Sequence, residues 1–382
     1  MTDNADVIIV GAGLIGLSIA YHLASKGISN VIVIDKEGVW GHGSSGRSAG
    51  GVRLEFSHPS AVKFSQYGLE MFRHFEDIFG ISSSFNACGY LFLTRDASKW
   101  TVMQNLSLMQ QALGVPVKCL SPQEVASQFS YVQMEGLVGG TFCADDGIAD
   151  PGAVLYGFAR RAIDLGVTIR LDEQVTGILM NHNHIAGVKT TKGIVMGGVV
   201  VNAAGPYAAA VGQMAGVEIP VRPYRRSIYV TTPFSKLPQT IPMTLELETT
   251  SYLRREGDSI LLGMSDPHEP SSYHTDVDHQ TLEKLIDTIL RWVPNLAEAS
   301  IMRGWAGLYE VSPDDTAIIG EVPEIPGFYM ANGFSGHGFM HSPATGRVIA
   351  ELIMGEEPFV DLTPFALARF NADRPTTETF VI

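Results

Sequence analysis

The distribution of apolar and polar residues near the N-terminus predicts a strand, a helix and a second strand. Residues 7–10 and 31–34 are unbroken runs of Val and Ile. Between them, apolar residues recur at helical spacing as far as Gly27, with Ala20 and Leu23 on the face that we expect to be buried. Short apolar runs of this kind are typical of strands covered on both faces of a parallel sheet. The chain therefore opens with a predicted β-α-β unit.

A glycine turn follows the first apolar run and suits the binding of an adenine dinucleotide. Gly11 permits a tight turn, Gly13 lets the backbone approach a pyrophosphate, and Gly16 lets helix and strand pack closely. The helix N-terminus would present free N–H groups and its positive dipole end to the phosphates. Asp35 offers a carboxylate to both ribose hydroxyls and argues against the 2′-phosphate of NADP, whereas FAD and NAD both fit. The candidate contacts are Gly11, Gly13, Leu14, Ile15, Gly16, Asp35 and Lys36.

Two further segments offer small residues and backbone donors to the same ligand. Residues 41–51 read GHGSSGRSAGG, and such a loop can wrap a second stretch of pyrophosphate, although a solvated linker has the same composition. The apolar run at 199–201 ends in Asn-Ala-Ala-Gly, where larger side chains would displace a ligand. These segments and the hairpin between them add the candidates Gly43, Ser44, Ser45, Arg47, Ser48, Ala49, Gly50, Gly51, Val175, Ala203, Ala204 and Gly205.

The rest of the chain alternates between helical and strand-rich stretches. Apolar spacing predicts helices at 60–79, 100–113, 151–166, 280–293 and 343–354. Strands are expected at 90–94, 167–171, 227–232 and 260–264, with a hairpin between 175 and 201. We predict an α/β (α+β overall) protein with a discontinuous Rossmann-like nucleotide-binding domain at 1–84, 146–216 and 317–382. A second, mainly β-sheet domain at 85–145 and 217–316 would bind the substrate.

Composition and charge narrow the classes of function. The 382 residues are 45% hydrophobic and 17% charged, which is typical of a globular enzyme long enough for two cores. A formal net charge of −14 argues against a nucleic-acid partner, and no apolar run reaches the length of a membrane span. The three cysteines show neither metal-ligand nor disulfide spacing, and acids stand where a leader peptide would carry basic residues. We therefore expect no metal site, no transmembrane segment and a cytoplasmic location.

Three motifs, in this order, resemble those of the glycine oxidase/D-amino acid oxidase family. They are GAGLIG at 11–16, VVNAAG at 200–205, and IIG at 318–320 followed by NGFSGHGFM at 332–340. The chain is most similar to the β subunits of heterotetrameric sarcosine oxidase and of dye-linked L-proline dehydrogenase. This resemblance implies a two-domain flavoprotein fold of the glutathione reductase type, FAD as the cofactor, and oxidation of the C–N bond of a small amino acid. Backbone donors would stabilise negative charge on the flavin ring, and the candidates are Gly333, Gly336, His337, Gly338, Phe339 and Met340.

Departures from the family pattern bear on flavin attachment and on the electron acceptor. Gly307 stands where monomeric sarcosine oxidase attaches its flavin to a cysteine, so we expect noncovalent FAD. Met340 stands where that family places a carboxylate-binding lysine, and Leu261 is aligned with a lysine thought to help oxygen react. Both changes remove positive charge near the flavin, which favours a dehydrogenase over an oxidase.

The carboxylate of an amino acid substrate still needs a cation. Arg53, which follows the glycine-rich loop, is the first candidate, and Arg254 and Arg255 are the next. Tyr252 resembles an active-site tyrosine of the family, and Tyr309 stands where glycine oxidase has a carboxylate-binding arginine. For each, the alternative is a salt-bridged or packed side chain. The candidate catalytic residues are Arg53, Tyr252, Tyr309, His337 and Met340, whereas Arg225 and Arg226 are interpreted as structural.

The sequence thus predicts an FAD-dependent oxidoreductase that converts a small secondary amino acid, such as sarcosine or proline, to an imine by hydride transfer to the flavin. Oxidation of a D-amino acid or of a 2-hydroxy acid on the same fold is one alternative. A flavin subunit that turns over only with a partner subunit is another. The substrate, the electron acceptor and the oligomeric state stay open.

Overall fold

The computed structural model describes residues 2–371 and 377–380. One part of it is organised around a six-stranded sheet with the strand order β19-β20-β13-β2-β3-β9. Neighbouring strands run parallel from β20 to β9, and β19 lies antiparallel at the edge. The sheet joins distant segments, because Ile9 pairs with both Val33 and Val201. Its strands are β2 (Val7–Val10), β3 (Val31–Ile34), β9 (Thr168–Arg170), β13 (Val200–Asn202), β19 (Ile318–Glu321) and β20 (Phe328–Asn332).

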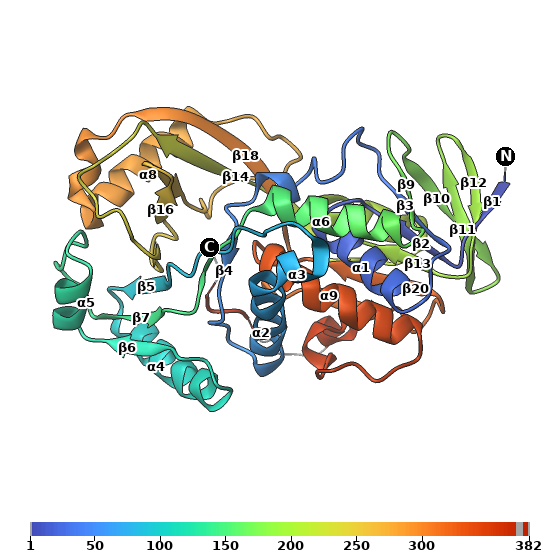
Figure 1. The fold of residues 1–382 in the computed structure, drawn as a ribbon, viewed down its shortest axis with the longest axis horizontal. Helices are drawn as coiled ribbons and strands as arrows, with labels where there is room; N and C mark the ends of the chain where they lie inside the picture. Colours follow the sequence, from blue (N-terminus) through green and yellow to red (C-terminus); the bar gives the residue numbers. More distant parts are fainter. Residues whose placement is uncertain (1, 372–376, 381–382) are drawn as a thin grey trace.

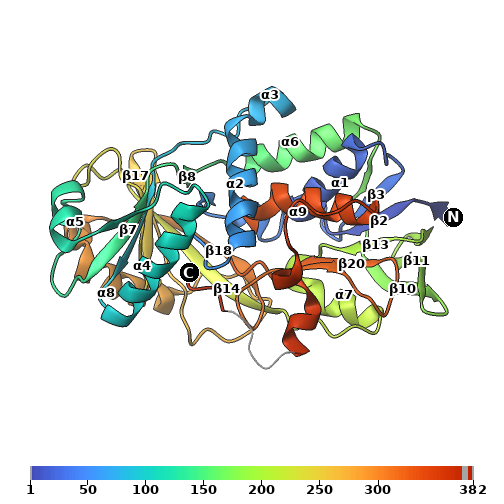
Figure 2. The same cartoon turned by 90° about the horizontal axis from the view of Figure 1, so that it is seen from below.

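Both faces of this sheet are covered, which explains its unbroken apolar strands. Ile9 belongs to a core shared with helices α1, α6 and α9, whereas Ile8 packs with α7 and a small four-stranded sheet. Figures 1 and 2 both show α1, α6 and α9 side by side. The helices are α1 (Leu14–Ser25), α6 (Pro151–Asp164), α7 (Ala208–Met214) and α9 (Gly338–Ile353). The small sheet consists of β1 (Thr2–Asn4), β12 (Gly193–Met196), β11 (His184–Thr190) and β10 (Val175–Asn181), in that order.

The other part contains an eight-stranded sheet, which lies at the opposite end of the molecule in Figure 1. One face packs with α5 (Pro122–Gln128) and α8 (His279–Trp292), and the other packs with α4 (Ala97–Ala112). Tyr90, Met243 and Tyr252 lie on that second face. The strand order is β18 (Ile301–Val311), β14 (Arg222–Thr231), β17 (Ser259–Gly263), β16 (Tyr252–Glu256), β15 (Met243–Glu246), β5 (Tyr90–Thr94), β7 (Gly139–Cys143) and β6 (Lys118–Leu120).

Short elements connect the two parts. Strand β4 (Gly51–Val52) pairs antiparallel with β8 (Gly147–Ile148) where the chain crosses between the sheets. Helix α2 (Pro59–Arg73) packs on α9, and α3 (Phe75–Phe79) follows it. The strands of the eight-stranded sheet all fall between residues 90–143 and 222–311. The domain boundaries expected from the sequence stay predictions.

Three elements differ from expectation for identifiable reasons. The helix expected at 60–79 is divided at His74, whose φ of −104° and ψ of 18° depart from helical values. Helix α9 begins at Gly338 and contains Pro343, five residues before the place where the sequence suggested a start. Pro343 cannot donate to the carbonyl of Phe339, and the Ser342 hydroxyl donates to that carbonyl instead, at 2.9 Å. The sequence suggests that a last strand is entered at 303–306, whereas β18 runs from Ile301 to Val311 because it pairs along β14.

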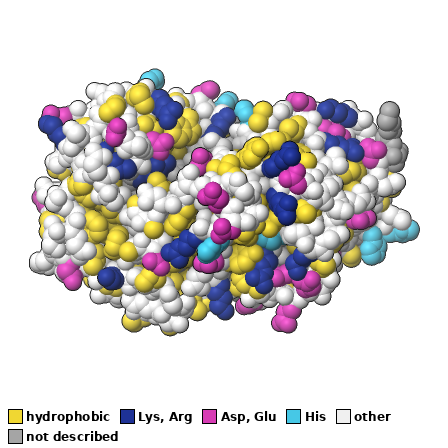
Figure 3. Space-filling view, in the orientation of Figure 1, with side chains coloured by type: hydrophobic (Ala, Val, Ile, Leu, Met, Phe, Trp, Pro, Cys, Tyr) yellow, Lys and Arg dark blue, Asp and Glu magenta, His cyan; other side chains and the backbone are white. Residues whose placement is uncertain are grey.

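Charged side chains of both signs are interspersed on the face shown in Figure 3, with no broad basic area over any element. Over the whole sequence, acidic residues outnumber basic ones and give a formal net charge of −14. In the described part of the chain, no helix is both long and apolar enough to cross a membrane.

Candidate cofactor and active site

An elongated cleft lies at the carboxyl ends of β2, β3 and β13, where open α/β sheets bind their ligands. Glycines are required here. A Cβ atom at Gly11, whose φ is +113°, would lie 2.3 Å from the carbonyl oxygen of Ala203. A Cβ atom at Gly16 would lie 1.9 Å from the carbonyl oxygen of Gly11, so Gly16 serves helix packing and does not line the cleft. The predicted residues that line it are Gly11, Gly13, Leu14, Ile15, Asp35, Lys36, Gly43, Ser44, Ser45, Arg47, Val175, Ala203, Ala204 and Gly205.

Asp35 is held in place for a ligand by two backbone donors. Its Oδ2 accepts from Ala12 N at 2.6 Å and its Oδ1 accepts from Glu37 N at 2.9 Å. Each oxygen keeps a second lone pair for another donor, such as a ribose hydroxyl. The neighbouring Lys36 Nζ lies 3.8 Å from the centroid of the Tyr207 ring. Tyr207 in turn stacks on Tyr273, with centroids 4.7 Å apart, and both rings line the cleft.

The glycine-rich loop at 41–51 is tied to elements on both sides of the cleft. It contains a single 3-10 turn, η1 (Ser45–Arg47). Ser45 Oγ accepts from Leu14 N at 3.0 Å, which satisfies one free donor at the start of α1. On the other side, Ser44 Oγ donates to Leu308 O at 2.6 Å, and Arg47 Nη1 donates to Ala306 O at 2.8 Å. The loop is therefore an ordered bridge from α1 to β18 and not a solvated linker.

The cleft continues into an inner cavity beside the eight-stranded sheet, because seven residues line both spaces: Leu14, Ile15, Ser44, Ser45, Arg47, Leu308 and Glu310. The N-terminus of α9 forms one wall. Gly338, Phe339 and Met340 occupy its first turn and line the cavity, so their N–H groups and the positive end of the helix dipole are available to a ligand. Of the other predicted residues, Ser48, Ala49, Gly51, Gly307, Gly336 and His337 line the cavity, whereas Gly50 and Gly333 do not.

Tyrosine rings form much of the remaining wall, each packed on a glycine. A Cβ atom at Gly336 would lie 2.4 Å from the Tyr309 ring, and one at Gly263, opposite Tyr252 in the sheet, would lie 2.3 Å from that ring. A Cβ atom at Gly51 would lie 1.8 Å from the Tyr90 hydroxyl. Burial raises the pKa of each tyrosine, so the hydroxyls stay neutral at physiological pH.

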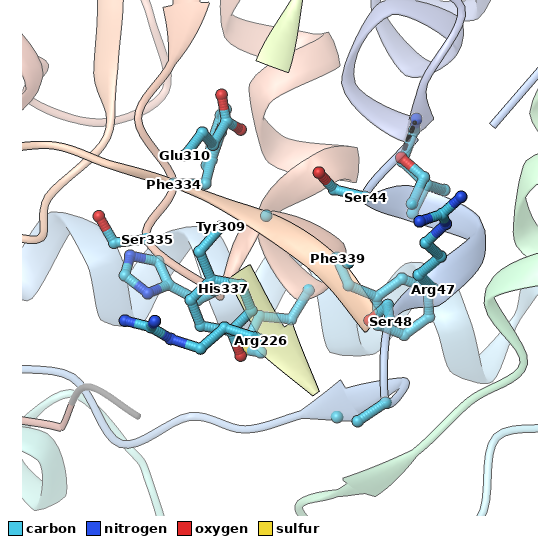
Figure 4. A pocket seen from close by; sticks show the side chains of 18 of the residues that line it. Ser44, Arg47, Ser48, Arg226, Tyr309, Glu310, Phe334, Ser335, His337 and Phe339 are labelled. Carbon is cyan, nitrogen blue, oxygen red and sulfur yellow. Dashed lines mark hydrogen bonds between the residues drawn. The ribbon is translucent and has the colours of Figure 1, made fainter. Parts of the chain in front are cut away.

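Two guanidinium groups face the inner cavity. Arg53 is buried, and its Nη1 and Nη2 donate to the backbone carbonyls of Glu55 and Phe380. Arg226 of β14 is partly buried, with its Cζ 5.4 Å from the centroid of the Tyr309 ring. Figure 4 shows Arg226, Tyr309 and His337 directed into the same space. Among the described residues, neither arginine forms an ion pair with an acid, and Arg226 Nε lacks a partner.

The expectation for the other arginines is partly wrong. Arg225 is structural as expected, because its Nε lies 3.0 Å from Glu269 Oε1. Arg226 was interpreted as structural too, but it lines the cavity. Arg254 and Arg255 do not reach it, since they donate to the backbone carbonyls of Ala49 and Pro238. Alternation along β14 could have paired Arg226 with Ile228 on one face, but it does not say which face meets the cavity.

The expected loss of positive charge is also corrected in part. Met340 is a buried, apolar wall residue, and Leu261 is buried in the core of the eight-stranded sheet without lining the cavity. The two guanidinium groups nevertheless supply positive charge. His337 adds none, because burial and its neighbours His341 and Arg53 hold its pKa well below the usual value. Glu310 stands between the two spaces, where its Oε2 accepts from Gly333 N at 3.2 Å and burial raises its pKa to about 8.

The residues present fit FAD. The close contact at Gly11 leaves no room for a side chain where a pyrophosphate would approach, and the starts of α1 and α9 both offer unpaired N–H groups. Reasoning from the sequence did not select Ser335, although it lies within the motif at 332–340. It also missed several lining residues that belong to no glycine motif: Tyr90, Tyr207, Arg226, Ile228, Met243, Tyr273, Thr275 and Glu310.

Comparisons with known proteins agree with this arrangement. A family model described as FAD dependent oxidoreductase matches residues 6–352. FAD-dependent oxidoreductase domain-containing protein 1 of Xenopus laevis is 28% identical over 427 aligned positions, covering 100% of this chain and 85% of the relative. Mitochondrial sarcosine dehydrogenase of Homo sapiens is 26% identical, and the match covers 97% of this chain but 42% of that protein. The crystal structure of L-proline dehydrogenase from P. horikoshii superposes with a TM-score of 0.89 at 31% identity, covering 97% of this chain and 99% of the other.

Proposed function

Because the chain belongs to the DAO family of FAD-dependent oxidoreductases, we propose that it oxidises the C–N bond of a small secondary amino acid, such as sarcosine or proline, to an imine. Two relatives support this substrate class, since one is named sarcosine dehydrogenase and the other L-proline dehydrogenase. The second is a solved structure that matches nearly the whole of both chains.

The observation that carries the proposal is the pair of guanidinium groups in the inner cavity. Arg53 and Arg226 have no acidic ion-pair partner in the described part of the chain, and a desolvated cation without a partner is costly. A substrate carboxylate would supply the missing negative charge through charge-assisted hydrogen bonds. The hydroxyls of Tyr252 and Tyr309 line the same space and offer further contacts.

The same charges favour the reactive form of the amine. Positive charge at Arg53 and Arg226 disfavours an ammonium ion nearby and so favours the neutral amine, whose lone pair is needed to form the imine. His337 is neutral because its pKa is held well below the usual value, and the tyrosines are neutral because burial raises theirs. When bound, FAD supplies the acceptor for the hydride that leaves the substrate carbon. The chain positions the substrate, excludes water and needs no nucleophile of its own.

We propose that the cleft holds the adenosine and pyrophosphate of FAD and that the inner cavity holds the flavin ring. Asp35 would bind the ribose, the α1 N-terminus and the loop at 41–51 would bind the phosphates, and the first turn of α9 would face the ring. Gly307 lies in β18 against Arg47, and the glycine offers no thiol for a covalent bond. FAD is accordingly proposed to be noncovalent.

We also propose a dehydrogenase and not an oxidase. The observation behind this choice is the apolar side chain of Met340 in the cavity wall, together with the relative named L-proline dehydrogenase. Arg53 and Arg226 are assigned to the substrate carboxylate, so they would be occupied during turnover. Rates with an artificial dye and with oxygen, measured on the same preparation, test the choice, and faster turnover with oxygen would contradict it.

An anaerobic substrate screen tests the central proposal. The purified, FAD-loaded chain is mixed with sarcosine, L-proline, D-proline, D-alanine and a 2-hydroxy acid, and the flavin absorbance is followed. Bleaching by sarcosine or L-proline at a higher kcat/KM than by the others is the expected result. No bleaching by any N-alkyl or cyclic amino acid would overturn it, and selective bleaching by D-alanine or the hydroxy acid would identify the alternative substrate class.

A further inference from the structure

The segment from Thr377 to Phe380 is fastened to both parts of the molecule. The Glu378 carboxylate accepts from Ser57 N at 3.0 Å and from Ser57 Oγ at 2.8 Å, and Thr379 N donates back to Ser57 Oγ at 2.9 Å. Glu378 N donates to Asp314 O at 3.1 Å. Ser57 lies just before α2, and Asp314 lies just after β18 of the eight-stranded sheet. Residues 377–380 therefore connect these two regions, which are far apart in the sequence.

The last residue of this segment fills the space behind the inner cavity. The Phe380 side chain is 0% exposed and its ring centroid lies 5.0 Å from that of Phe92. Its core cluster also contains Tyr90, Met243 and Tyr252, all of which line the cavity on their other side. Removing the Phe380 ring would therefore leave a void beside Phe92, in the core cluster to which these three cavity residues belong.

The backbone of the same residue holds Arg53. Arg53 Nη2 donates to the carbonyl of Phe380, and Nη1 donates to the carbonyl of Glu55. The guanidinium carbon lies 4.0 Å from the centroid of the Phe56 ring. No carboxylate in the described part of the chain forms an ion pair with Arg53, so neutral carbonyls fix its direction, and the charge of Glu378 acts on it only from a distance. One of these two carbonyls belongs to a segment more than 300 positions away in sequence.

We propose that residues 377–380 are a positioning strap, which fixes Arg53 for the substrate carboxylate and supports the inner wall of the cavity. The proposal rests on the substrate-binding role given to Arg53 under the proposed function. The strap touches neither substrate nor cofactor in this scheme and acts through Arg53, Tyr90 and Tyr252. It is distinct from the cofactor cleft, since none of its residues lines either space.

Chemical labelling of Arg53 tests the strap without a substrate. The FAD-loaded enzyme is treated with phenylglyoxal, and labelling of Arg53 is measured by peptide mass spectrometry, with Arg160, whose side chain is 61% exposed, as the internal standard. Neither substitution removes the Phe380 carbonyl, but each loosens the segment that carries it, and losing its hydrogen bond to the charged guanidinium corresponds to about tenfold or more in an opening equilibrium. We expect at least that increase in the labelling rate for Phe380→Ala and for Glu378→Gln, and no increase for Thr377→Ala, whose side chain is exposed. Protection equal to wild type in both test variants would overturn the proposal.

Steady-state kinetics supply the second readout. With whichever amino acid bleaches the wild-type flavin, Glu378→Gln and Phe380→Ala should raise KM by about tenfold, with kcat changed less and FAD content unchanged. Phe380→Leu, which fills most of the space, should restore KM and labelling together even where Phe380→Ala fails to fold. If none of the amino acids bleaches the wild-type flavin, the proposed function is contradicted. The labelling of Arg53 still tests the strap proposal in that case. If the wild-type flavin is bleached and the variants keep the wild-type KM, the strap proposal is contradicted while the proposed function stands.

Discussion

Arg226 brings to the cavity a charge that its own strand does not neutralise. Its neighbour Arg225 is paired with Glu269, whereas Arg226 donates, among the described residues, only to the carbonyl of Arg225. Since charged hydrogen bonds contribute about 1.5–3 kcal/mol, Arg226→Met should raise KM for the amino acid by roughly 10- to 100-fold. FAD content should not change. Arg222→Ala, an exposed position on the same strand, is the matched control in steady-state kinetics, and an equal rise in KM for both variants would contradict the assignment.

Glu310 makes FAD affinity depend on pH. Burial raises its pKa to about 8, so the carboxyl is neutral below that pH and ionised above it. A negative charge between the cleft and the inner cavity would repel the phosphates proposed to lie nearby. FAD affinity should therefore be constant up to about pH 8 and then fall by up to about tenfold for each further pH unit.

The isosteric variant separates this effect from general alkaline loss of affinity. Glu310→Gln keeps the shape of the side chain and cannot ionise, so its FAD affinity should stay flat across the same range. Fluorescence titration of the apoprotein with FAD at several pH values measures both proteins. Parallel declines in the two would show that Glu310 is not the responsible group.

The sequence predicts site residues that belong to a backbone motif. It misses site residues that reach the cavity only because two distant segments pack together. Asp35 follows a strand and a glycine turn at fixed spacing, and the structure finds it in the cleft with two backbone donors. Arg226 and Glu310 sit on strands β14 and β18, where adjacent residues point to opposite faces. Only the packing of two distant segments decides which face meets the cavity, and one sequence contains no record of that packing.

The loop between β17 and α8 contacts the other part of the molecule. It occupies residues 264–278, and its Tyr273 stacks on Tyr207, which follows β13 in the other part of the molecule. The rings are 15° from parallel, and Tyr273 and Thr275 line the outer end of the cleft near Lys36. The loop thus covers the place proposed for the adenosine of FAD.

Removing this stack should speed the loss of FAD. An aromatic pair contributes about 0.5–1.5 kcal/mol beyond burial, so Tyr273→Ala should raise the FAD dissociation rate by roughly 2- to 10-fold. Tyr156→Ala on α6, where the side chain is similarly exposed and away from the cleft, is the control. The rate is read from the rise in flavin fluorescence after dilution of the loaded protein. A change of the same size in the control would exclude a specific role for the loop.

Element types followed from the sequence more reliably than element ends. Strands β2 and β3 and helix α6 lie where the apolar pattern predicted them, and in the structure Asp150 caps α6 by accepting from Gly152 N at 2.8 Å. The start of α9 was missed because proline normally breaks a helix, and the hydroxyl of Ser342 replaces the bond that Pro343 cannot make. A compensation of this kind depends on one side-chain rotamer, which composition does not reveal.

In the molecule as a whole, the proposed cofactor site is formed by segments that are far apart in the sequence. The cleft is lined by Gly11, by Ala203 and by Ala331, which follow or lie in three adjacent strands of the six-stranded sheet. The inner cavity adds residues from the eight-stranded sheet. FAD bound in both spaces would contact each of these parts at once. Unfolding of any one of them would therefore release the cofactor, so binding should stabilise the folded chain as a unit.

Thermal unfolding at increasing FAD concentration tests this coupling. A ligand that binds only the folded state adds about 2.7 kcal/mol at 100 times its Kd, so the midpoint should rise by a few degrees and continue to rise with the logarithm of free FAD. Asp35→Ala weakens the ribose contact and should move the same curve to higher FAD concentration, measured relative to the variant's own apoprotein midpoint, because the loss of two backbone hydrogen bonds also lowers that midpoint. Acid precipitation should leave the yellow colour in the supernatant, because Gly307 provides no thiol. Colour retained in the pellet would contradict noncovalent binding. In the unfolding experiment, a midpoint that does not change with FAD concentration would contradict the proposal that FAD contacts both parts of the molecule.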